Sequence, residues 1–548
     1  MLSNTQKRIQ ARWQSRGHQV RRMSLLKQFS NTTQLGGDLS RTSEGTPVYP
    51  GSDVTTLTSD FLGDWRSNDS WQRFDMWRVR NRSRQLERGN PWCQGFKRAM
   101  LNNVLGFKGF HWKPEVTTGL QYGDTIVGKP DDNAISLIKT AVDEFGKKEN
   151  LTTRKKLSRR MLDRLLLARL IFDGEVLLQK VSGFPGNDYK FAWQVINPDY
   201  LDQNLNKLMP NGNIVKMGIE FEGTWKYPVA YHILKRRPND NFYNYQQLDQ
   251  QRYIRIPAED IIHAYVCTED DEQTRGWPWI FAAVITLFRL GKYQEAALVN
   301  AAIGASRGVY IQKKLPEGFI GDPKELFDED ANDLVLDVPQ GSMLELPWQA
   351  EAKTLDMGYP DGDFKDFCNA MLLTTSSAFG TSYATTTGDL SQANFVSSRL
   401  GQVEEQENFK NIQEFLIEHI KQPMHEEEVW RLQLIGKIPL PVTKYDKFKR
   451  AAFAGRRWKF VQPVDDMRAK EIALNNLTTS ISDIIAETTQ EDTEDVFKRI
   501  ANDNALMDKY GLKRVTTPAG SVVGEDPNQD PNQDPETAEG ETGIKSGK

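Results

Sequence analysis

The chain of 548 residues contains little cysteine and no long apolar run. Its three cysteines, Cys93, Cys267 and Cys368, are odd in number and far apart, which excludes a disulfide framework or a cysteine zinc site and indicates a reducing compartment. The most apolar run, 277–288, is far shorter than the roughly 20 residues that span a bilayer. The N-terminus lacks the apolar segment of a secretory signal. We therefore expect an intracellular protein without membrane contact.

Motifs for phosphate binding and hydrolysis are also missing. None of the Gly-Lys pairs is followed by Ser or Thr, so there is no Walker A loop. Gly304–Gly308 fits the pattern G-x-S-x-G, but a helical pattern precedes its serine. A nucleophile elbow has a strand at that place. The sequence therefore argues against a hydrolase.

Candidate metal ligands are few. His425 begins the string HEEEV, which lacks the second histidine of H-E-x-x-H, and we interpret His419 and His425 as flanking a solvated helix end. The acidic run Glu269–Glu272 could hold Mg²⁺, but consecutive carboxylates diverge and Arg275 follows, which favours a loop with internal ion pairs. We expect no catalytic residue, no metal and no cofactor, and so no enzyme.

The two ends of the chain differ from its middle. Residues 1–37 hold seven Lys and Arg and no acid, and we interpret residues 1–60 as a flexible basic arm. The arm is either solvated or settles on nucleic acid or an acidic partner. Residues 516–548 contain repeated DPNQ units and are predicted to be disordered.

A segment rich in Trp and Arg begins the predicted folded part, near Phe61. Basic residues interleaved with aromatics can hold single-stranded nucleic acid by stacking. However, Trp92, Phe96, Met100 and Val104 recur every four residues, which is the buried stripe of an amphipathic helix. We favour core packing over base stacking for this segment.

Residues 61–276 have the pattern of an α+β domain. A helix over 157–170 runs into a turn and strand over 171–178. Further strands are predicted at 191–196, 215–221, 229–234 and 261–266, with turn signals at Asn197–Asp199 and Asn211-Gly212.

The second half is mainly helical. The predicted helix over 278–305 has bulky side chains in its first half and small ones in its second half. There, Ala297, Ala301 and Gly304 are positioned for close helix packing. A small β element follows: one strand over 309–312, which includes Val309 and Ile311, and one hairpin. The hairpin residues with apolar side chains are Leu334, Leu336, Val338, Leu344 and Leu346.

A second helix carries Phe367 and Met371 on one face and ends at Gly380. Residues 381–391 are polar and rich in β-branched side chains, and we predict a loop there. A third long helix is predicted over 392–422 and ended by Pro423. Its middle is polar on all sides, which indicates that this part of the helix faces solvent or a subunit interface.

The order of these elements and several strings resemble the lambda-like family of tailed-phage portal proteins. Four strings carry the resemblance: Asn90–Gly106, Leu170–Glu175, Gln273–Pro278 and Phe379–Arg399. A fifth match, over 458–497, resembles the family's C-terminal segment, although the family's usual Asp-Pro is replaced by Pro463-Val464-Asp465. Together the matches cover about residues 65–510.

The resemblance implies a portal fold in a ring of twelve subunits. In order, its parts are a flexible arm (1–60), wing (61–277), stem helix (278–306), clip (307–357), second stem helix (358–380), tunnel loop (381–391), long helix returning to the wing (392–440), C-terminal wing and crown (441–515) and disordered tail (516–548). It implies an α/β wing, a two-helix stem, a small β-containing clip and a helical crown.

By the same resemblance, the tunnel loop projects into the DNA channel. The residues expected there are Tyr383, Thr385, Thr386, Thr387, Gly388, Asp389 and Gln392. Their hydroxyls would offer weak hydrogen bonds to phosphates without reading sequence, and Tyr383 would brace the loop against its neighbour. The clip residues named above would form a subunit interface.

The implied function is a conduit for double-stranded DNA at one capsid vertex, in a virion assembled in host cytoplasm. The implied partners are copies of the chain, the terminase large subunit, a head-completion or adaptor protein, and major capsid and scaffold proteins. The net charge of −4 suits a channel through which DNA slides, since a basic lumen would hold phosphates tightly. Two alternatives remain: a packaging enzyme such as a terminase or nuclease, and a capsid or tail component that does not contact DNA.

Overall fold

The computed structural model describes residues 67–118, 121–122, 125–126, 130–238, 252–268, 270–305, 309–313, 350–354, 363–389, 391, 395–458, 463–489, 491 and 493–512. The description below concerns a compact unit that begins at Gln72. The predicted hairpin over 334–346, the residue Gln392 and both terminal segments, 1–60 and 516–548, lie outside the described residues.

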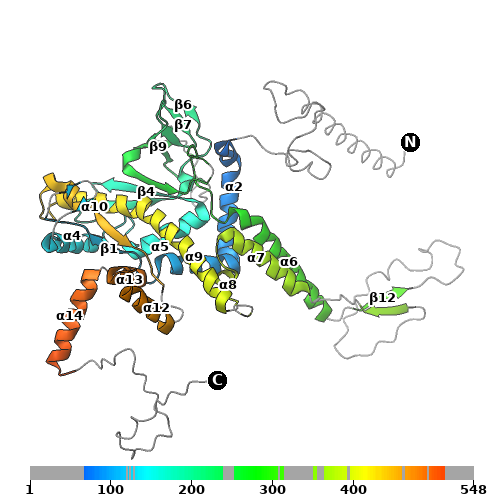
Figure 1. The fold of residues 1–548 in the computed structure, drawn as a ribbon. Helices are drawn as coiled ribbons and strands as arrows, with labels where there is room; N and C mark the ends of the chain where they lie inside the picture. The colour runs from blue at the N-terminus through cyan, green and yellow to red at the C-terminus, as the bar shows by residue number, and fades with distance from the viewer. Residues whose placement is uncertain are drawn as a thin grey trace, which may run out of the picture. The chain divides into compact units, whose positions relative to one another are not determined.

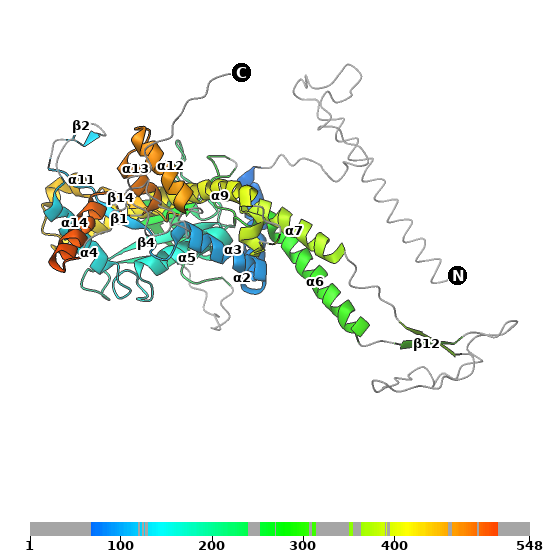
Figure 2. The ribbon, with the colours of Figure 1, turned by 60° about the horizontal axis from the view of Figure 1, so that its bottom comes forward.

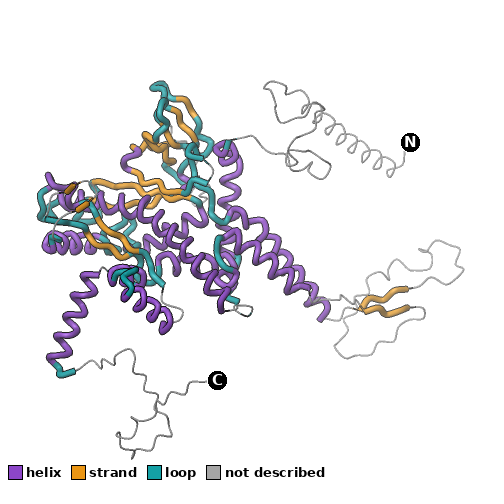
Figure 3. Tube along the Cα trace, in the orientation of Figure 1, coloured by secondary structure: helices purple, strands orange, loops and turns teal. Residues whose placement is uncertain are grey.

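The described part is a mixed helix and sheet structure (Figures 1 and 3). Its α-helices are α2 (Asn68–Gly89), α3 (Pro91–Met100), α4 (Asp132–Phe145), α5 (Arg159–Asp173), α6 (Val284–Ala305), α7 (Asp363–Phe379), α8 (Tyr383–Thr387), α9 (Phe395–Leu416), α10 (Gln422–Leu434), α11 (Tyr445–Phe448), α12 (Pro463–Asn475), α13 (Ile481–Thr488) and α14 (Thr493–Lys509). The strands are β1 (His111–Pro114), β2 (Gln121–Tyr122), β3 (Thr125–Ile126), β4 (Glu175–Ser182), β5 (Phe191–Ile196), β6 (Lys207–Leu208), β7 (Ile214–Lys216), β8 (Ile219–Phe221), β9 (Pro228–Leu234), β10 (Tyr253–Pro257), β11 (Ile261–Tyr265), β12 (Val309–Lys313), β13 (Ala350–Thr354) and β14 (Ala451–Ala454).

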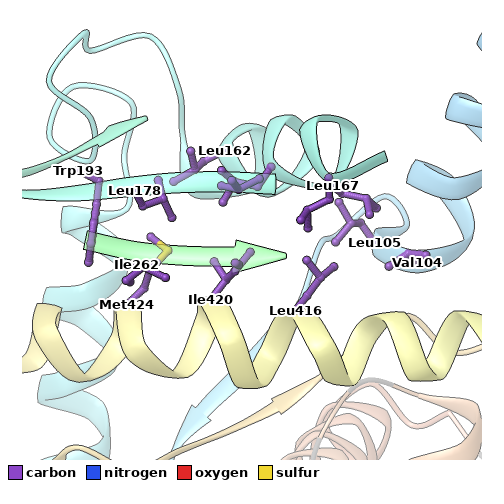
Figure 4. Close-up of a cluster of buried hydrophobic side chains, with 14 of the residues drawn as sticks. Val104, Leu105, Leu162, Leu167, Leu178, Trp193, Ile262, Leu416, Ile420 and Met424 are labelled. Atoms are coloured by element: carbon purple, nitrogen blue, oxygen red, sulfur yellow. The ribbon is translucent and has the colours of Figure 1, made fainter. Parts of the chain in front are cut away.

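The main core surrounds an antiparallel sheet with the strand order β11-β4-β5. Figure 4 shows α5 on one side of this sheet and the helix that contains Leu416, Ile420 and Met424 on the other. Leu178 on β4 and Ile262 on β11 lie between them. All five side chains are buried, so hydrophobic burial on both faces holds the helices on the sheet.

A second antiparallel sheet has the order β10-β9-β8-β7-β6 and its own small core. The sequence predicted one strand over 215–221, and this is wrong. Met217 and Gly218 have φ values of 45° and 87° and form a tight turn in which Lys216 pairs with Ile219. Two positive φ values in a two-residue connection produce a hairpin, so β7 and β8 are separate strands. The predicted turn at Gly212, whose φ is 85°, is confirmed.

The aromatic residues of the Trp- and Arg-rich segment have two different environments. Phe96, Met100 and Val104 are at most 2% exposed, which confirms the predicted core stripe of α3 and the short π-helix, Leu101–Leu105, that follows it. Phe74 and Trp77 on α2 are 57% and 51% exposed. Core packing is therefore the wrong interpretation for these two residues.

The long helix after the predicted tunnel loop does not end at Pro423. α9 passes into a π-helix, Ile417–Lys421, and then into α10. Pro423 directly follows the π-helix, so its missing backbone N–H falls where the hydrogen-bond pattern of the helix changes. His425 is consequently inside a continuous helix and is 2% exposed, so its interpretation as a solvated helix end is wrong.

Helices α6 and α7 lie side by side in Figures 1 and 2. β12 pairs with β13 in antiparallel register, with Val309 opposite Thr354 and Ile311 opposite Ala352. The sequence predicted the β12 strand but not β13. Strands β1 and β14, far apart in sequence, also pair, with Trp112 opposite Phe453.

Candidate functional site

The segment expected to be a tunnel loop contains a short helix. Ser382 caps α8, because its hydroxyl accepts from the Thr385 backbone N–H at 3.1 Å. The Thr387 hydroxyl donates to the Tyr383 carbonyl at 2.7 Å, and Gly388 ends the helix at a φ of 74°. Local hydroxyl bonds of this kind can stabilise one turn despite β-branched side chains. The prediction of a plain loop is therefore wrong for Tyr383–Thr387.

The threonine hydroxyls of α8 bond within the protein. Thr385 donates to Glu405 of α9 at 2.9 Å, and the hydroxyls of Thr381 and Thr386 lie 2.8 Å apart. Glu405, only 8% exposed, also accepts from the Ser382 backbone N–H at 3.2 Å. These bonds hold α8 to α9 and occupy hydroxyl protons that the sequence analysis assigns to phosphate contacts.

Two further helices position α8. The Tyr383 hydroxyl donates to Asn369 of α7 at 3.0 Å, so Tyr383 braces the segment within its own chain. On the α3 side, a Cβ at Gly95 would lie 3.4 Å from the Thr386 carbonyl oxygen. The Phe96 and Phe379 rings stack with centroids 4.0 Å apart. The segment is thus held by α3, α7 and α9. Half-buried Asp389 follows it.

The predicted stem residues pack in part. Ala297 is buried at 6% exposure, whereas Ala301 is half-buried. Met371 is half-buried against the cluster of Leu290, Cys368 and Leu372. Phe367 remains 44% exposed, with its ring 4.8 Å from Tyr293. Gly304 lies in α6.

The predicted clip residues fall into two groups. Val309 and Ile311 lie on β12. The others lie outside the described residues: Leu334, Leu336, Val338, Leu344 and Leu346.

Two of the strings that carry the family resemblance meet in space. Gly174, with a φ of 87°, ends α5, and a Cβ there would lie 2.3 Å from the Trp277 carbonyl carbon. A Cβ at Gly276 would lie 2.1 Å from the Gly174 carbonyl oxygen. The Trp279 N–H donates to the Ile171 carbonyl at 2.9 Å. Only glycine fits such a close approach of two backbones.

A buried ionic network surrounds this crossing, the close contact between the α5–β4 turn and the segment before α6. Arg275, fully buried, donates from Nε to both carboxylate oxygens of Glu175 at 2.9 and 2.8 Å. Arg80 of α2 donates to the same carboxylate at 2.8 Å. Arg84 of α2 donates to Asp173 at 2.7 Å. The network thereby joins α2, β4 and the segment before α6. In the acidic run, Glu272 forms a surface ion pair with Lys226 at 2.6 Å.

The charges in this network are compensated. Burial opposes ionisation of Glu175, but Arg275 and Arg80 outweigh it and hold the pKa of this carboxyl well below its usual range. Burial lowers the pKa of His263. A neutral His263 can donate from Nε2 to Glu175, 3.1 Å away, and accept from the Tyr231 hydroxyl at Nδ1, 3.3 Å away. The arrangement is a structural anchor.

Within the described ranges, no group of three or more His, Cys, Asp or Glu side chains is placed to hold a metal ion. The same part of the chain has no helix long and apolar enough to cross a bilayer.

The profile of the phage portal proteins of the lambda family matches residues 58–413. The chain belongs to this family. The match includes the turn between α5 and β4, helices α6, α7 and α8, and all but the last three residues of α9. It confirms the resemblance found in the sequence.

Individual relatives extend the comparison. A protein described as a probable portal protein of Halomonas phage phiHAP-1 is 28% identical over 507 residues, covering 89% of this chain and 94% of the relative. Solved structures that match include the neck of a native gene transfer agent (GTA) particle computed with C12 symmetry. It has a TM-score of 0.39 and 14% identity, and the match covers 74% of this chain and 93% of that one. The neck of an empty GTA particle computed with C6 symmetry matches at 0.36 and 14% identity, covering 78% and 96%.

Sequence reasoning located some of this arrangement and missed the rest. It found the Gly174 and Gly276 strings but not the ion pairs around them. Arg80 and Arg84 lie four residues apart on α2, and the sequence pattern places them only in a segment rich in Trp and Arg. The available signal was their spacing, because Met76, Arg80, Ser83 and Arg84 share one helix face, which is buried.

Proposed function

We propose that twelve copies of this chain form a ring at one capsid vertex, where the ring is a conduit for double-stranded DNA during packaging and ejection. The observation that carries this proposal is the family membership over residues 58–413. The virion is then the site of action, after assembly in host cytoplasm. No step of this function requires a catalytic group.

Exposed apolar side chains on the helical half support an assembly. Large hydrophobic residues stand outward on α6, α7 and α9: Ile285, Phe288, Leu298, Val299, Phe367, Leu373, Leu400 and Val403. Each is at least 44% exposed in the single chain. Contiguous exposed apolar surface marks interaction sites, and a ring would cover it between neighbouring copies.

Within this ring, we assign the channel-facing role to residues 381–391. Because the Thr385, Thr386 and Thr387 hydroxyls already bond within the protein, the segment would act as a firm collar without positive charge rather than as a phosphate-binding loop. It contains Asp389 and no Lys or Arg, so DNA could slide past it.

The clip is assigned to residues 307–357, which include the paired strands β12 and β13. It would present the ring's narrow end to the terminase large subunit and later to a head-completion or adaptor protein. Removing Asp330–Leu346 leaves both paired strands in the chain. We expect that variant to assemble rings but to package no DNA, and normal packaging would refute the clip assignment.

Particle mass tests the proposed function directly. Twelve subunits of 62.6 kDa give a ring of about 750 kDa, which native mass spectrometry resolves, and electron microscopy should show a central hole. A stable monomer with ATP- or metal-dependent cleavage of DNA would instead support a packaging enzyme.

A further inference from the structure

Helix α2 carries an exposed stripe that the proposed function does not explain. The stripe consists of Phe74, Trp77, Arg78, Asn81, Gln85 and Arg88, spaced at i, i+3, i+4, i+7, i+11 and i+14. This spacing places them on one helix face. The face contains two aromatic rings and two guanidinium groups and no carboxylate. Over 14 residues it extends about 21 Å.

The rotation of α2 is fixed, so the stripe has to point outward. On the opposite face, Gln72 donates to the Arg275 carbonyl at 2.5 Å, Arg80 to Glu175 at 2.8 Å and Ser83 to the Phe172 carbonyl at 2.7 Å. These three side chains are buried. The buried ionic network thus presents Phe74 and Trp77 to whatever lies outside this chain.

Helix α9 and the following π-helix carry a stripe of the opposite sign. It consists of Leu400, Val403, Glu404, Glu407, Asn411, Glu414 and Glu418, all exposed. It contains four carboxylates and no cation, although Lys410 beside it pairs with Glu407. Its rotation is also fixed, because Phe409, Gln413 and Leu416 are buried on the other face. Over 18 residues it extends about 27 Å.

We propose that the α2 stripe of one copy packs against the α9 stripe of the adjacent copy in the ring. Each stripe combines two apolar side chains with charges, and the charges are opposite. In a ring, each copy contacts its neighbours through two different surfaces, and the two stripes supply such a pair. The proposal rests on the proposed function, because the occupant is a second copy of this chain.

Nucleic acid is the competing occupant of the α2 stripe, since arginine and aromatic side chains also suit phosphates and bases. The structure favours a second copy because the same chain offers an acidic, partly apolar stripe of similar length. Among the described residues, Arg88 forms no ion pair. The one ion-pair partner of Arg78 there is Asp75 of the same helix, at 3.7 Å.

A charge-reversal cycle tests the pairing in the full-length chain. The first variant is Arg78→Glu with Arg88→Glu, the second is Glu407→Arg with Glu414→Arg, and the third combines all four changes. Opposed like charges weaken an interface, so each double reversal should raise the concentration for half-assembly by roughly tenfold or more at 150 mM salt. The combined variant should return to within about threefold of wild type. Mass photometry measures the ring fraction.

A matched control is Arg98→Glu with Arg154→Glu, which makes the same charge change at exposed residues off both stripes. It should assemble like wild type. Circular dichroism and thermal melting check that every variant folds, which these exposed positions favour.

The outcomes are distinguishable. If wild type forms rings and neither reversal weakens them, or if the combined variant is not rescued, the pairing is refuted and the proposed function stands. If the α2 reversal assembles normally but loses binding to a 30-bp duplex, the stripe is a nucleic-acid surface and the pairing is refuted. If wild type remains monomeric, the ring fails and the pairing fails with it.

Discussion

Arg275 is a fully buried guanidinium whose charge is balanced chiefly by one carboxylate. Besides Glu175, it donates to the carbonyls of Pro198 at 3.1 Å and Met217 at 3.3 Å. It therefore fastens the two sheets and the crossing before α6 to one another. Removing one member of such a buried pair leaves the other uncompensated, which is more damaging than losing a surface contact.

We expect Arg275→Met to destabilise the protein by about 3–5 kcal/mol. Glu175 would keep the side chains of Arg80 and His263 and the backbone N–H of Gly276 as partners. The control is Arg237→Met, which removes a 43%-exposed side chain paired with Asp199 and should cost less than about 1 kcal/mol. Urea unfolding followed by circular dichroism gives both values, and equal shifts in the midpoint would contradict the anchor role.

His425 provides a pH-dependent test at the same scale. It lies between the Trp112 ring, at 5.1 Å, and the Phe453 ring, at 6.0 Å. Burial, together with the positive charges of Arg159 and Lys421, lowers the pKa of His425 to about 3. The native state therefore holds this imidazole neutral, while the unfolded chain protonates it near pH 6.5.

Protonation of the unfolded chain alone destabilises the native state as the pH falls from about 6.5 to 3, by roughly 4–5 kcal/mol in total. His425→Leu should remove this part of the pH dependence. The exposed His419 on the same helix provides the control, and His419→Leu should keep the wild-type slope. A wild-type slope in His425→Leu would show that His425 titrates normally in the native state.

At the scale of elements, the sequence predicts those helices and turns that local periodicity and glycine positions determine. The stripe from Phe96 to Val104 and the stop at Gly380, whose φ is 63°, follow from periodicity and glycine alone. The β7–β8 turn could not be found this way, because the alternation of apolar and other residues over 215–221 is that of a single strand and hides the positive φ of Met217. Helix α8 depends on Glu405, twenty residues beyond Thr385, and a local pattern does not contain that contact.

The contact between the α5–β4 turn and the segment before α6 can be tested with two glycines. Gly174 and Gly183 both have positive φ, but a Cβ at Gly183 would meet nothing within 4 Å. Gly183→Ala should therefore cost about 1 kcal/mol for backbone strain alone. Gly174→Ala adds a collision with the backbone of Trp277 and should cost roughly 3 kcal/mol or more. Thermal melting compares the two, and similar losses would argue against a tight crossing.

Glu405→Ala tests how α8 is held. The Ser382 N–H and the Thr385 hydroxyl would lose their acceptor, at about 1–3 kcal/mol locally. We expect faster hydrogen exchange over 381–389, intact ring assembly and poorer retention of packaged DNA. Gln402→Ala, an exposed change on the same helix, should alter none of these. Retention equal to wild type despite faster exchange would separate the segment from the collar role.

At the scale of the whole molecule, family and element order could be predicted, whereas surfaces could not. Trp77 illustrates why. Its spacing is helical whether it faces a core or a neighbour, and the rotation of α2 is fixed by the inward hydrogen bonds of Gln72, Arg80 and Ser83. A single sequence contains no information about which exposed residues a second copy covers.

The basic N-terminal segment is a prediction at this scale. Residues 1–37 contain seven positive charges and no acid, and we expect the segment to dock on capsid protein, scaffold or packaged DNA. Because exposed charges are screened by salt, removing residues 1–37 should reduce incorporation into proheads more at low salt than at physiological salt. Incorporation assays at both salt concentrations decide this, and unchanged values at both would leave the segment without a docking role.

The π-helix at Ile417–Lys421 has a consequence for the phase of the long helix. From Glu405 to Leu432, buried side chains recur mostly every four residues: Glu405, Phe409, Gln413, Leu416, Ile420, Met424, Glu428 and Leu432. A plain α-helix with 3.6 residues per turn would wind this row gradually around its axis. The π-helix contains one extra residue in its turn, and this residue offsets about 100° of that rotation. Shortening it by a residue would leave two good helices whose core-facing sides no longer point the same way.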